Sequence, residues 1–289
     1  MRFAIWGFQT NDETNAHVMG IIENLQEHGH DIAILDSFAA ILGLEHDGFS
    51  LIQADQLPAD LDFILSIGGD GTLLSAAQAV MKRPIPILGI NLGKLGFLTS
   101  LERDWRQGLE QLINGHYHVE ERMVLNCRIE HQDGAEEVFW ALNEIVIERA
   151  GDFNIIPLRV EVDESYMNTY KADGLIISTP TGSTAYALSA GGPVLDPGLD
   201  ALLIMPISAH TLSVRPVVLP DDSQVTVKLV DPAGRASLHV DGKNSLPVTA
   251  HDRIVIRASG YRIQLVAMPR SSFFEKLRRK LHWGKRFEA

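Results

Sequence analysis

One short run of residues combines the types that phosphate chemistry uses. Residues 68–72 read Gly-Gly-Asp-Gly-Thr and lie between an apolar strand pattern, Phe63–Ile67, and a helical pattern, Leu73–Met81. Glycines let the backbone approach a ligand closely, and the following helix offers free N–H groups and its positive end to an anion. The Asp70 carboxylate repels phosphate, so its presence in an anion-binding loop indicates a further role, such as coordinating a metal, hydrogen-bonding a hydroxyl or accepting that hydroxyl's proton. The run predicts a phosphate loop made of Gly68, Gly69, Gly71 and Thr72.

The same run has a simpler interpretation, in which the glycines form a tight turn and Asp70 caps the next helix. It is not a Walker A loop, because the sequence has no G-x-x-x-x-G-K-[ST] string, and the G-x-G-x-x-G string of Rossmann dinucleotide sites is also missing. The choice between a turn and a ligand site therefore depends on groups elsewhere in the chain.

Two further stretches carry polar groups suited to a nucleotide. Asn143 and Glu144 place an amide beside a carboxylate, and together these groups can bind an adenine edge and a ribose diol. The alternative is that they are ordinary surface residues, as most such pairs are. The apolar strand Leu175–Ile177 leads into small hydroxylated residues up to Pro193, whose modest side chains leave backbone groups accessible to a polar ligand. A flexible linker is the alternative, but apolar segments flank this run on both sides.

Two loops add charged side chains. We interpret His210 as a hydrogen-bonded structural histidine in preference to a phosphate contact. Arg215 precedes Pro216, is therefore in extended backbone, and can clamp a phosphate or pair with a carboxylate. Residues 240–243 read Val-Asp-Gly-Lys and predict a tight turn from which Lys243 can reach an anionic ligand.

The composition limits how this protein can bind phosphates. Its 289 residues carry a formal net charge of −12, which opposes broad attraction to nucleic acid or to an anionic membrane. Phosphate binding must then rely on backbone N–H groups, a few placed cations or a metal. Cys127, the single cysteine, cannot form an intrachain disulfide, and neither a signal peptide nor a spanning apolar stretch is evident. We therefore expect a cytoplasmic protein without nucleic-acid or membrane partners.

The order of the elements predicts two domains. Strand patterns at residues 3–6, 31–35, 63–67 and 85–90 alternate with helical patterns, which is typical of a Rossmann-like parallel α/β sheet. From about residue 116, short apolar and polar alternations indicate a mainly β domain. In the basic tail, Phe274, Leu277 and Leu281 share a helical face, which we expect to pack on the α/β domain in preference to a membrane surface. The predicted domains are residues 1–115 with 268–289, and residues 116–267.

Taken together, these strings resemble the NAD kinase family. The match includes residues 68–72, 91–98, 143–144, 173–193, 210–216 and 241–242, and it spans nearly the whole chain in order. The 68–72 run alone is also similar to loops of diacylglycerol kinases, sphingosine kinases and phosphofructokinases, whereas the 173–193 run is far more specific. The resemblance implies transfer of the ATP γ-phosphoryl group to the adenosine ribose 2′-hydroxyl of NAD. It also implies that the tail completes the α/β domain and that NAD binds between the two domains.

The resemblance further implies roles for individual positions. Asp70 would face the acceptor hydroxyl and accept its proton. The implied NAD-binding positions are Asp70, Gly71, Asn143, Glu144, Asn154, Lys171, Asp173, Thr184, Ala185, Tyr186, Ala187, Leu188, Ser189 and Lys243. Residue type varies within the family at the positions of Asn154, Lys171 and Lys243. The family also implies a divalent cation such as Mg²⁺, bound mainly through phosphates and without a protein metal site, and homodimers or homotetramers.

Two other functions fit parts of the sequence. A lipid kinase would share the 68–72 loop and could use the basic tail at a membrane, but the 173–193 run counts against it. A non-catalytic sensor of NAD or NADP would bind the dinucleotide without needing Asp70 and would produce no NADP. A nicotinamide-dependent dehydrogenase is disfavoured because its Rossmann fingerprint is missing.

Overall fold

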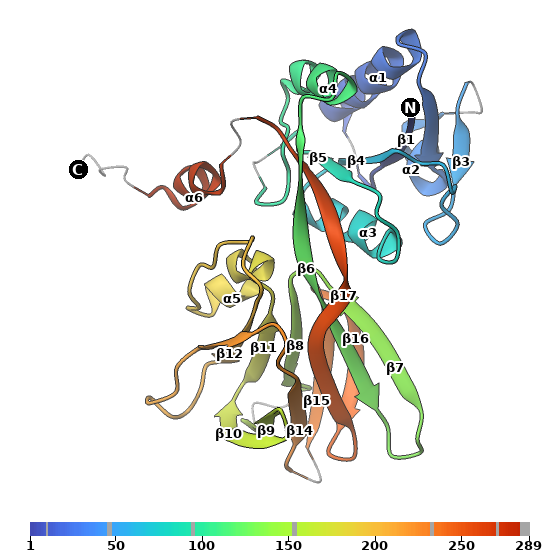
Figure 1. Ribbon diagram of the computed structural model, residues 1–289. Coiled ribbons are helices and arrows are strands. Elements are labelled where there is room, and N and C mark those ends of the chain that lie inside the picture. The colour runs from blue at the N-terminus through green and yellow to red at the C-terminus, as the bar shows by residue number, and fades with distance from the viewer. Residues whose placement is uncertain are drawn as a thin grey trace. The chain divides into compact units, whose positions relative to one another are not determined.

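The computed structural model describes residues 1–9, 11–44, 48–93, 96–151, 155–231, 234–269 and 272–283. The chain divides into two compact units, Met1–Glu121 with Ile263–Ala289, and Arg122–Arg262 (Figure 1). The first unit is α/β and the second is mainly β, which confirms the predicted fold class. The units divide inside two long strands, β6 (His118–Glu130) and β17 (Arg253–Ala267), and the domain boundaries drawn from the sequence stay a prediction.

The first unit is built on a parallel sheet in the order β5-β4-β1-β2-β3, and the end of β17 pairs with β5. Its strands are β1 (Arg2–Trp6), β2 (Asp31–Leu35), β3 (Ser50–Ile52), β4 (Phe63–Ile67) and β5 (Ile87–Ile90). β4 and β5 are buried along their whole length, as their mostly apolar sequences predict. Ligands of such sheets bind beyond the carboxyl ends of the strands, where the loops after β4 and β5 lie.

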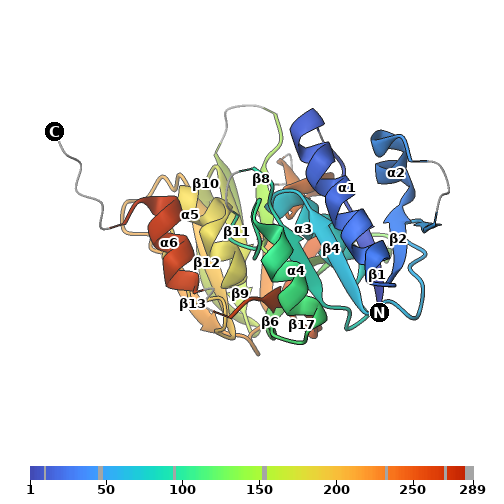
Figure 2. The same cartoon turned by 90° about the horizontal axis from the view of Figure 1, so that it is seen from above.

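The helices of the first unit are α1 (Asp12–Glu27), α2 (Asp36–Leu42), α3 (Asp70–Ala79), α4 (Trp105–Ile113) and α6 (Phe273–Leu281). α1 begins with a capping box formed by Asn11 and Thr14, and Gly29, with φ +69°, follows its end. α4 lies beside α1 (Figure 2), where Trp105 Nε1 donates to His17 Nδ1 at 3.2 Å. This hydrogen bond joins α4 to α1.

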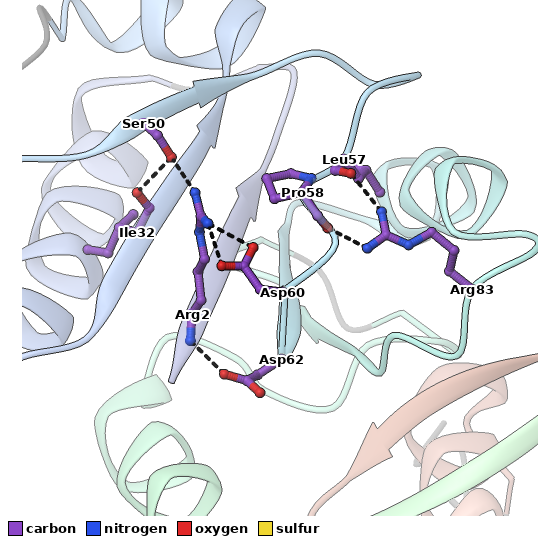
Figure 3. Close-up of polar contacts among 8 residues, drawn as sticks. All are labelled: Arg2, Ile32, Ser50, Leu57, Pro58, Asp60, Asp62 and Arg83. Carbon is purple, nitrogen blue, oxygen red and sulfur yellow. Dashed lines mark hydrogen bonds and ion pairs between the residues drawn. The ribbon is translucent and has the colours of Figure 1, made fainter.

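Polar contacts hold the segment between β3 and β4 (Figure 3). Arg2 Nη1 donates to both carboxylate oxygens of Asp60, at 2.7 and 2.8 Å, and this bond lowers the pKa of the Asp60 carboxyl. Arg83 donates to the carbonyl oxygens of Leu57 and Pro58. The chain is therefore fixed at the amino end of β4, the strand that leads into the 68–72 loop.

The second unit contains two antiparallel arrays with a shared apolar core. A six-stranded sheet has the order β13-β12-β11-β8-β15-β16, and the other array has β10, β9, β14 and β17, with β6 and β7 joined to it. The core includes Ile145 and Ile177 from the first array and Leu158 and Val225 from the other. The bounds are β7 (Glu136–Ala141), β8 (Glu144–Arg149), β9 (Ile156–Val162), β10 (Ser165–Ala172), β11 (Gly174–Ser178), β12 (Ala201–Ile207), β13 (Val217–Pro220), β14 (Val225–Leu229), β15 (Arg235–Val240) and β16 (Lys243–Thr249).

The tail helix α6 belongs to the first unit, as expected, but its predicted apolar face is partly wrong. Leu277 is 1% exposed, whereas Phe274 is 59% exposed. Among the described residues, no helix has both the length and the apolar character needed to cross a bilayer.

Candidate functional site

The 68–72 loop has a backbone that only glycine permits at its first position. Gly68 has φ +149°, and a Cβ there would stand 2.3 Å from Thr72 Oγ1. The Gly68 N–H donates to the Ile90 carbonyl at 2.9 Å, which ties the loop to the end of β5. The loop is thus fixed at the carboxyl ends of two neighbouring parallel strands.

Asp70 is oriented by backbone groups of a second loop. Its carboxylate accepts the Phe97 N–H at 2.8 Å and the Leu98 N–H at 3.0 Å. Gly96 makes room for this contact, since a Cβ there would stand 2.0 Å from Asp70 Oδ1. The N-cap of α3 is Gly69, without a side-chain capping bond, so the interpretation of Asp70 as a helix cap is wrong.

The first turn of α3 keeps backbone donors available for an anion. The N–H groups of Thr72 and Leu73 donate to the Gly69 carbonyl, at 3.0 and 3.3 Å. Within the described ranges, the N–H groups of Asp70 and Gly71 have no protein acceptor. A Cβ at Gly69 or Gly71 would meet nothing, so these donors are open to a ligand. Together with the positive end of the helix, they suit a phosphate group.

In the second unit, Asp241 holds the segment that carries Asn143 and Glu144. Its carboxylate accepts the backbone N–H groups of Leu142, Asn143 and Glu144, at 2.9, 2.8 and 3.1 Å. Asp241 and Gly242 have φ +49° and +69° and form the two-residue turn between β15 and β16, which the Asp-Gly pair predicts. β7 ends at residue 141 and β8 begins at residue 144, so Asp241 binds the backbone between these two strands.

Glu144 is a buried carboxyl whose protonation is altered by its surroundings. Its side chain is 5% exposed, and Oε2 has no hydrogen-bond partner in the described structure. Loss of hydration and, to a smaller extent, the Asp241 charge raise the pKa of Glu144 to about 8, while the Tyr186 backbone N–H acts in the opposite direction. At neutral pH the carboxyl is therefore mostly protonated and can both donate and accept a hydrogen bond.

The hydroxylated run after β11 is an ordered element, so the linker alternative is wrong. Residues Thr181–Thr184 form a 3-10 helix, and Tyr186–Ser189 form α5. A Cβ at Gly182 would stand 2.2 Å from the Asn143 carbonyl oxygen, and the Thr179 hydroxyl donates to the Leu142 carbonyl at 2.6 Å. The small residues therefore let this run pack closely against the segment that carries Asn143 and Glu144.

The other predicted side chains vary in their contacts. Asp173 is 3.5 Å from Arg149 in an ion pair, and Lys171 and Lys243 are exposed. Arg215 donates to the Leu212 and Val214 carbonyls, which uses its guanidinium locally.

The remaining predicted residues differ in how exposed their side chains are. The side chain of His210 is exposed, and only its backbone N–H has a partner, the Lys171 carbonyl, in the described structure. Around α5, Ala187 is buried, Thr184, Ala185 and Leu188 are partly buried, and Tyr186 and Ser189 are exposed. Asn154 lies outside the described residues.

The predicted groups are divided between the two units: the 68–72 loop with Asp70 belongs to the first unit, and the remaining candidate residues belong to the second. Three groups described above were not singled out from the sequence. Asp241 was noted only within a motif, and the Phe97 and Leu98 N–H groups leave no signal in a sequence. In the described ranges, no group of three or more His, Cys, Asp or Glu side chains is arranged to hold a metal ion.

Comparison with known proteins gives consistent matches along the chain. The sequence profile of the ATP-NAD kinase N-terminal domain matches residues 50–117, and that of the ATP-NAD kinase C-terminal domain matches residues 142–268. The NAD kinase of Geotalea daltonii is 45% identical over 236 residues, covering 81% of this chain and 83% of the relative. The NAD kinase of Bacteroides fragilis (strain ATCC 25285) is 38% identical over 291 residues and covers 98% of both chains.

Solved structures of NAD and NADH kinases also match this chain. An NAD kinase from Archaeoglobus fulgidus in complex with ATP has 27% identity and a TM-score of 0.75, covering 96% of this chain and 99% of that one. Yeast NADH kinase complexed with NADH has 23% identity and a TM-score of 0.90, covers 99% and 89%, and shows the shared fold. Because two family profiles match in order and relatives match from end to end, this chain belongs to the NAD kinase family.

Proposed function

We propose that this protein is an NAD kinase that transfers the γ-phosphoryl group of ATP to the 2′-hydroxyl of the adenosine ribose of NAD, giving NADP and ADP. The curated relatives named NAD kinase and the solved relative in complex with ATP support both substrates. One structural observation is the main support for the proposed reaction. The carboxylate of Asp70 is oriented by two backbone N–H groups at the open first turn of α3, where a phosphate can bind.

Asp70 is the proposed proton acceptor. A ribose hydroxyl is far less acidic than a carboxylic acid, so its proton moves late in the reaction. In a loose phosphoryl-transfer transition state, positioning and charge neutralisation carry most of the acceleration. Each Asp70 oxygen accepts one backbone N–H and keeps a lone pair for the acceptor hydroxyl. General-base catalysis of this kind contributes on the order of 10²–10⁴-fold.

The proposed NAD contacts lie in the second unit. The protonated Glu144 can donate to one ribose oxygen and accept from a neighbouring hydroxyl, and Asn143 offers an amide beside it. Asp173 and residues 184–189 are the proposed contacts to the rest of the dinucleotide. Lys171 and Lys243, both exposed, and Asn154 are proposed on family resemblance alone.

We further propose that a divalent cation such as Mg²⁺ accompanies ATP. The partly exposed Asp70 carboxylate and the open 68–72 loop fit an ion held mainly by phosphate oxygens, since Mg²⁺ needs few protein ligands. When bound, the ion supplies positive charge that residues 68–72 themselves lack. An excess of chelator should abolish transfer, and undiminished activity in chelator would contradict this part of the proposal.

The proposal extends to assembly and location. We propose a homodimer or homotetramer in the cytoplasm, without nucleic-acid or membrane partners. The net charge of −12 supports the last point, because it disfavours association with polyanions.

The test is incubation of the pure protein with NAD, ATP and Mg²⁺, followed by detection of NADP with an NADP-specific dehydrogenase. NADP that forms only when all three are present supports the proposal. Binding of NAD without product would instead support a sensor, and phosphorylation of a lipid would support a lipid kinase.

A further inference from the structure

The tail helix α6 brings a cation to Asp70. Lys280 Nζ lies 3.9 Å from Asp70 Oδ2 and 4.3 Å from the centroid of the Phe97 ring. Phe97 is also the residue whose backbone N–H holds the Asp70 carboxylate. One lysine of the tail therefore stands over both the proposed catalytic carboxylate and the loop that orients it.

The position of Lys280 is set by the docking of α6. Leu277, one turn earlier, is 1% exposed, and Lys276 Nζ donates to the Phe97 carbonyl at 3.1 Å. Arg279 pairs with Glu102 at 2.8 Å. These contacts anchor the helix without Lys280, so the ammonium of Lys280 is not needed to hold the tail in place.

The ammonium of Lys280 still has hydrogen-bond donors to offer. A separation of 3.9 Å from Asp70 is too long for a hydrogen bond, and the Phe97 ring face attracts the charge without accepting an N–H in the usual geometry. Within the described ranges, Lys280 has no hydrogen-bonded partner, and its side chain is 28% exposed. A bound anion could therefore take these donors.

We propose that Lys280 binds the phosphate chain of the donor nucleotide, so that the tail helix supplies the lysine that the 68–72 loop lacks. This inference rests on the proposed kinase function. A phosphate that enters the loop meets the negative Asp70, and their repulsion opposes binding. An ammonium about 4 Å from Asp70 offsets that repulsion, and it is a compact point charge with three donors, which suits phosphate.

The rival explanation is that Lys280 only helps to dock α6. The variant Arg279→Met distinguishes docking from phosphate binding, because it removes a docking contact of the neighbouring residue and leaves Lys280 in place. Arg278 is exposed on the same helix, so Arg278→Met controls for the loss of one positive charge.

The experiment compares the wild type with Lys280→Met, Lys280→Arg, Arg279→Met and Arg278→Met. Two quantities are measured, the Kd of ATP in Mg²⁺ by titration calorimetry and kcat/KM for ATP at saturating NAD. We expect Lys280→Met to weaken both by about 10- to 100-fold, the factor for one hydrogen bond to a charged group. Lys280→Arg should lose less, the KM for NAD should change less than about twofold, and both control variants should stay within about threefold of the wild type.

Two results would overturn the inference: Lys280→Met within about twofold of the wild type in both quantities, or Arg279→Met losing as much as Lys280→Met. Melting temperatures are recorded for every variant, and Lys280→Gln replaces Lys280→Met under the same criteria if the latter does not fold. If the wild type binds ATP but forms no NADP, the proposed function fails, while the Kd comparison still decides the role of Lys280.

Discussion

Glu144 should make folding stability fall as the pH rises, the opposite of the effect of a salt-bridged carboxylate. Burial raises its pKa from the ordinary 4.5 to about 8, so the folded protein binds more protons than the unfolded chain between these values. Stability from this group is complete below pH 4.5 and is lost as the pH rises toward 8. The difference of about 3.5 pH units corresponds to roughly 5 kcal/mol at pH values above 8.

Glu144→Gln removes this dependence, because a neutral amide of nearly the same size replaces the titrating group. Urea unfolding should give a variant within about 1 kcal/mol of the wild type near pH 5 and more stable by up to roughly 5 kcal/mol near pH 8.5. Glu164→Gln, at an exposed site of the same unit, serves as the control and should show no such divergence. A stability difference between Glu144→Gln and the wild type that does not change with pH would refute the reasoning.

Further predictions concern the groups that position the two candidate sites. Gly96→Ala places a methyl group where the structure leaves 2.0 Å to Asp70 Oδ1, so kcat should fall at least about tenfold. Gly93→Ala, with its nearest atom at 3.5 Å, should leave steady-state kinetics nearly unchanged, and equal losses in the two variants would contradict the account. Asp241→Ala removes the acceptor of three backbone N–H groups, so urea unfolding should show a loss of roughly 2–4 kcal/mol and the KM for NAD should rise. An unchanged KM for NAD in a folded Asp241→Ala protein would contradict the idea that this turn positions groups that bind NAD.

The local structure around the 68–72 loop could be predicted from the sequence. A buried apolar strand followed by glycines and a helical pattern is a signal within about 20 residues, and β4, the loop and α3 match it. The groups that hold Asp70 could not be predicted. Phe97 and Leu98 donate backbone N–H groups, which every residue type has, and they reach Asp70 only because β4 and β5 pair in parallel.

The segment of Asn143 and Glu144 shows the same limit. The sequence shows that an amide and a carboxyl side chain are adjacent, but not that Asp241 binds the backbone that carries them. Such a distant contact leaves no signal in the local pattern. In the tail, the nine-residue helix α6 is too short for its apolar spacing to fix the buried face, so Leu277 was correctly placed inside and Phe274 was not.

The most direct test of the central claim is the turnover of Asp70→Asn in NADP formation from NAD, ATP and Mg²⁺. The amide keeps the shape of the carboxylate but cannot accept the proton of the ribose hydroxyl. The account predicts that kcat falls by on the order of 10²–10⁴-fold while the variant keeps its fold. Near-normal turnover in the folded Asp70→Asn protein would contradict the assignment of Asp70 as the proton acceptor.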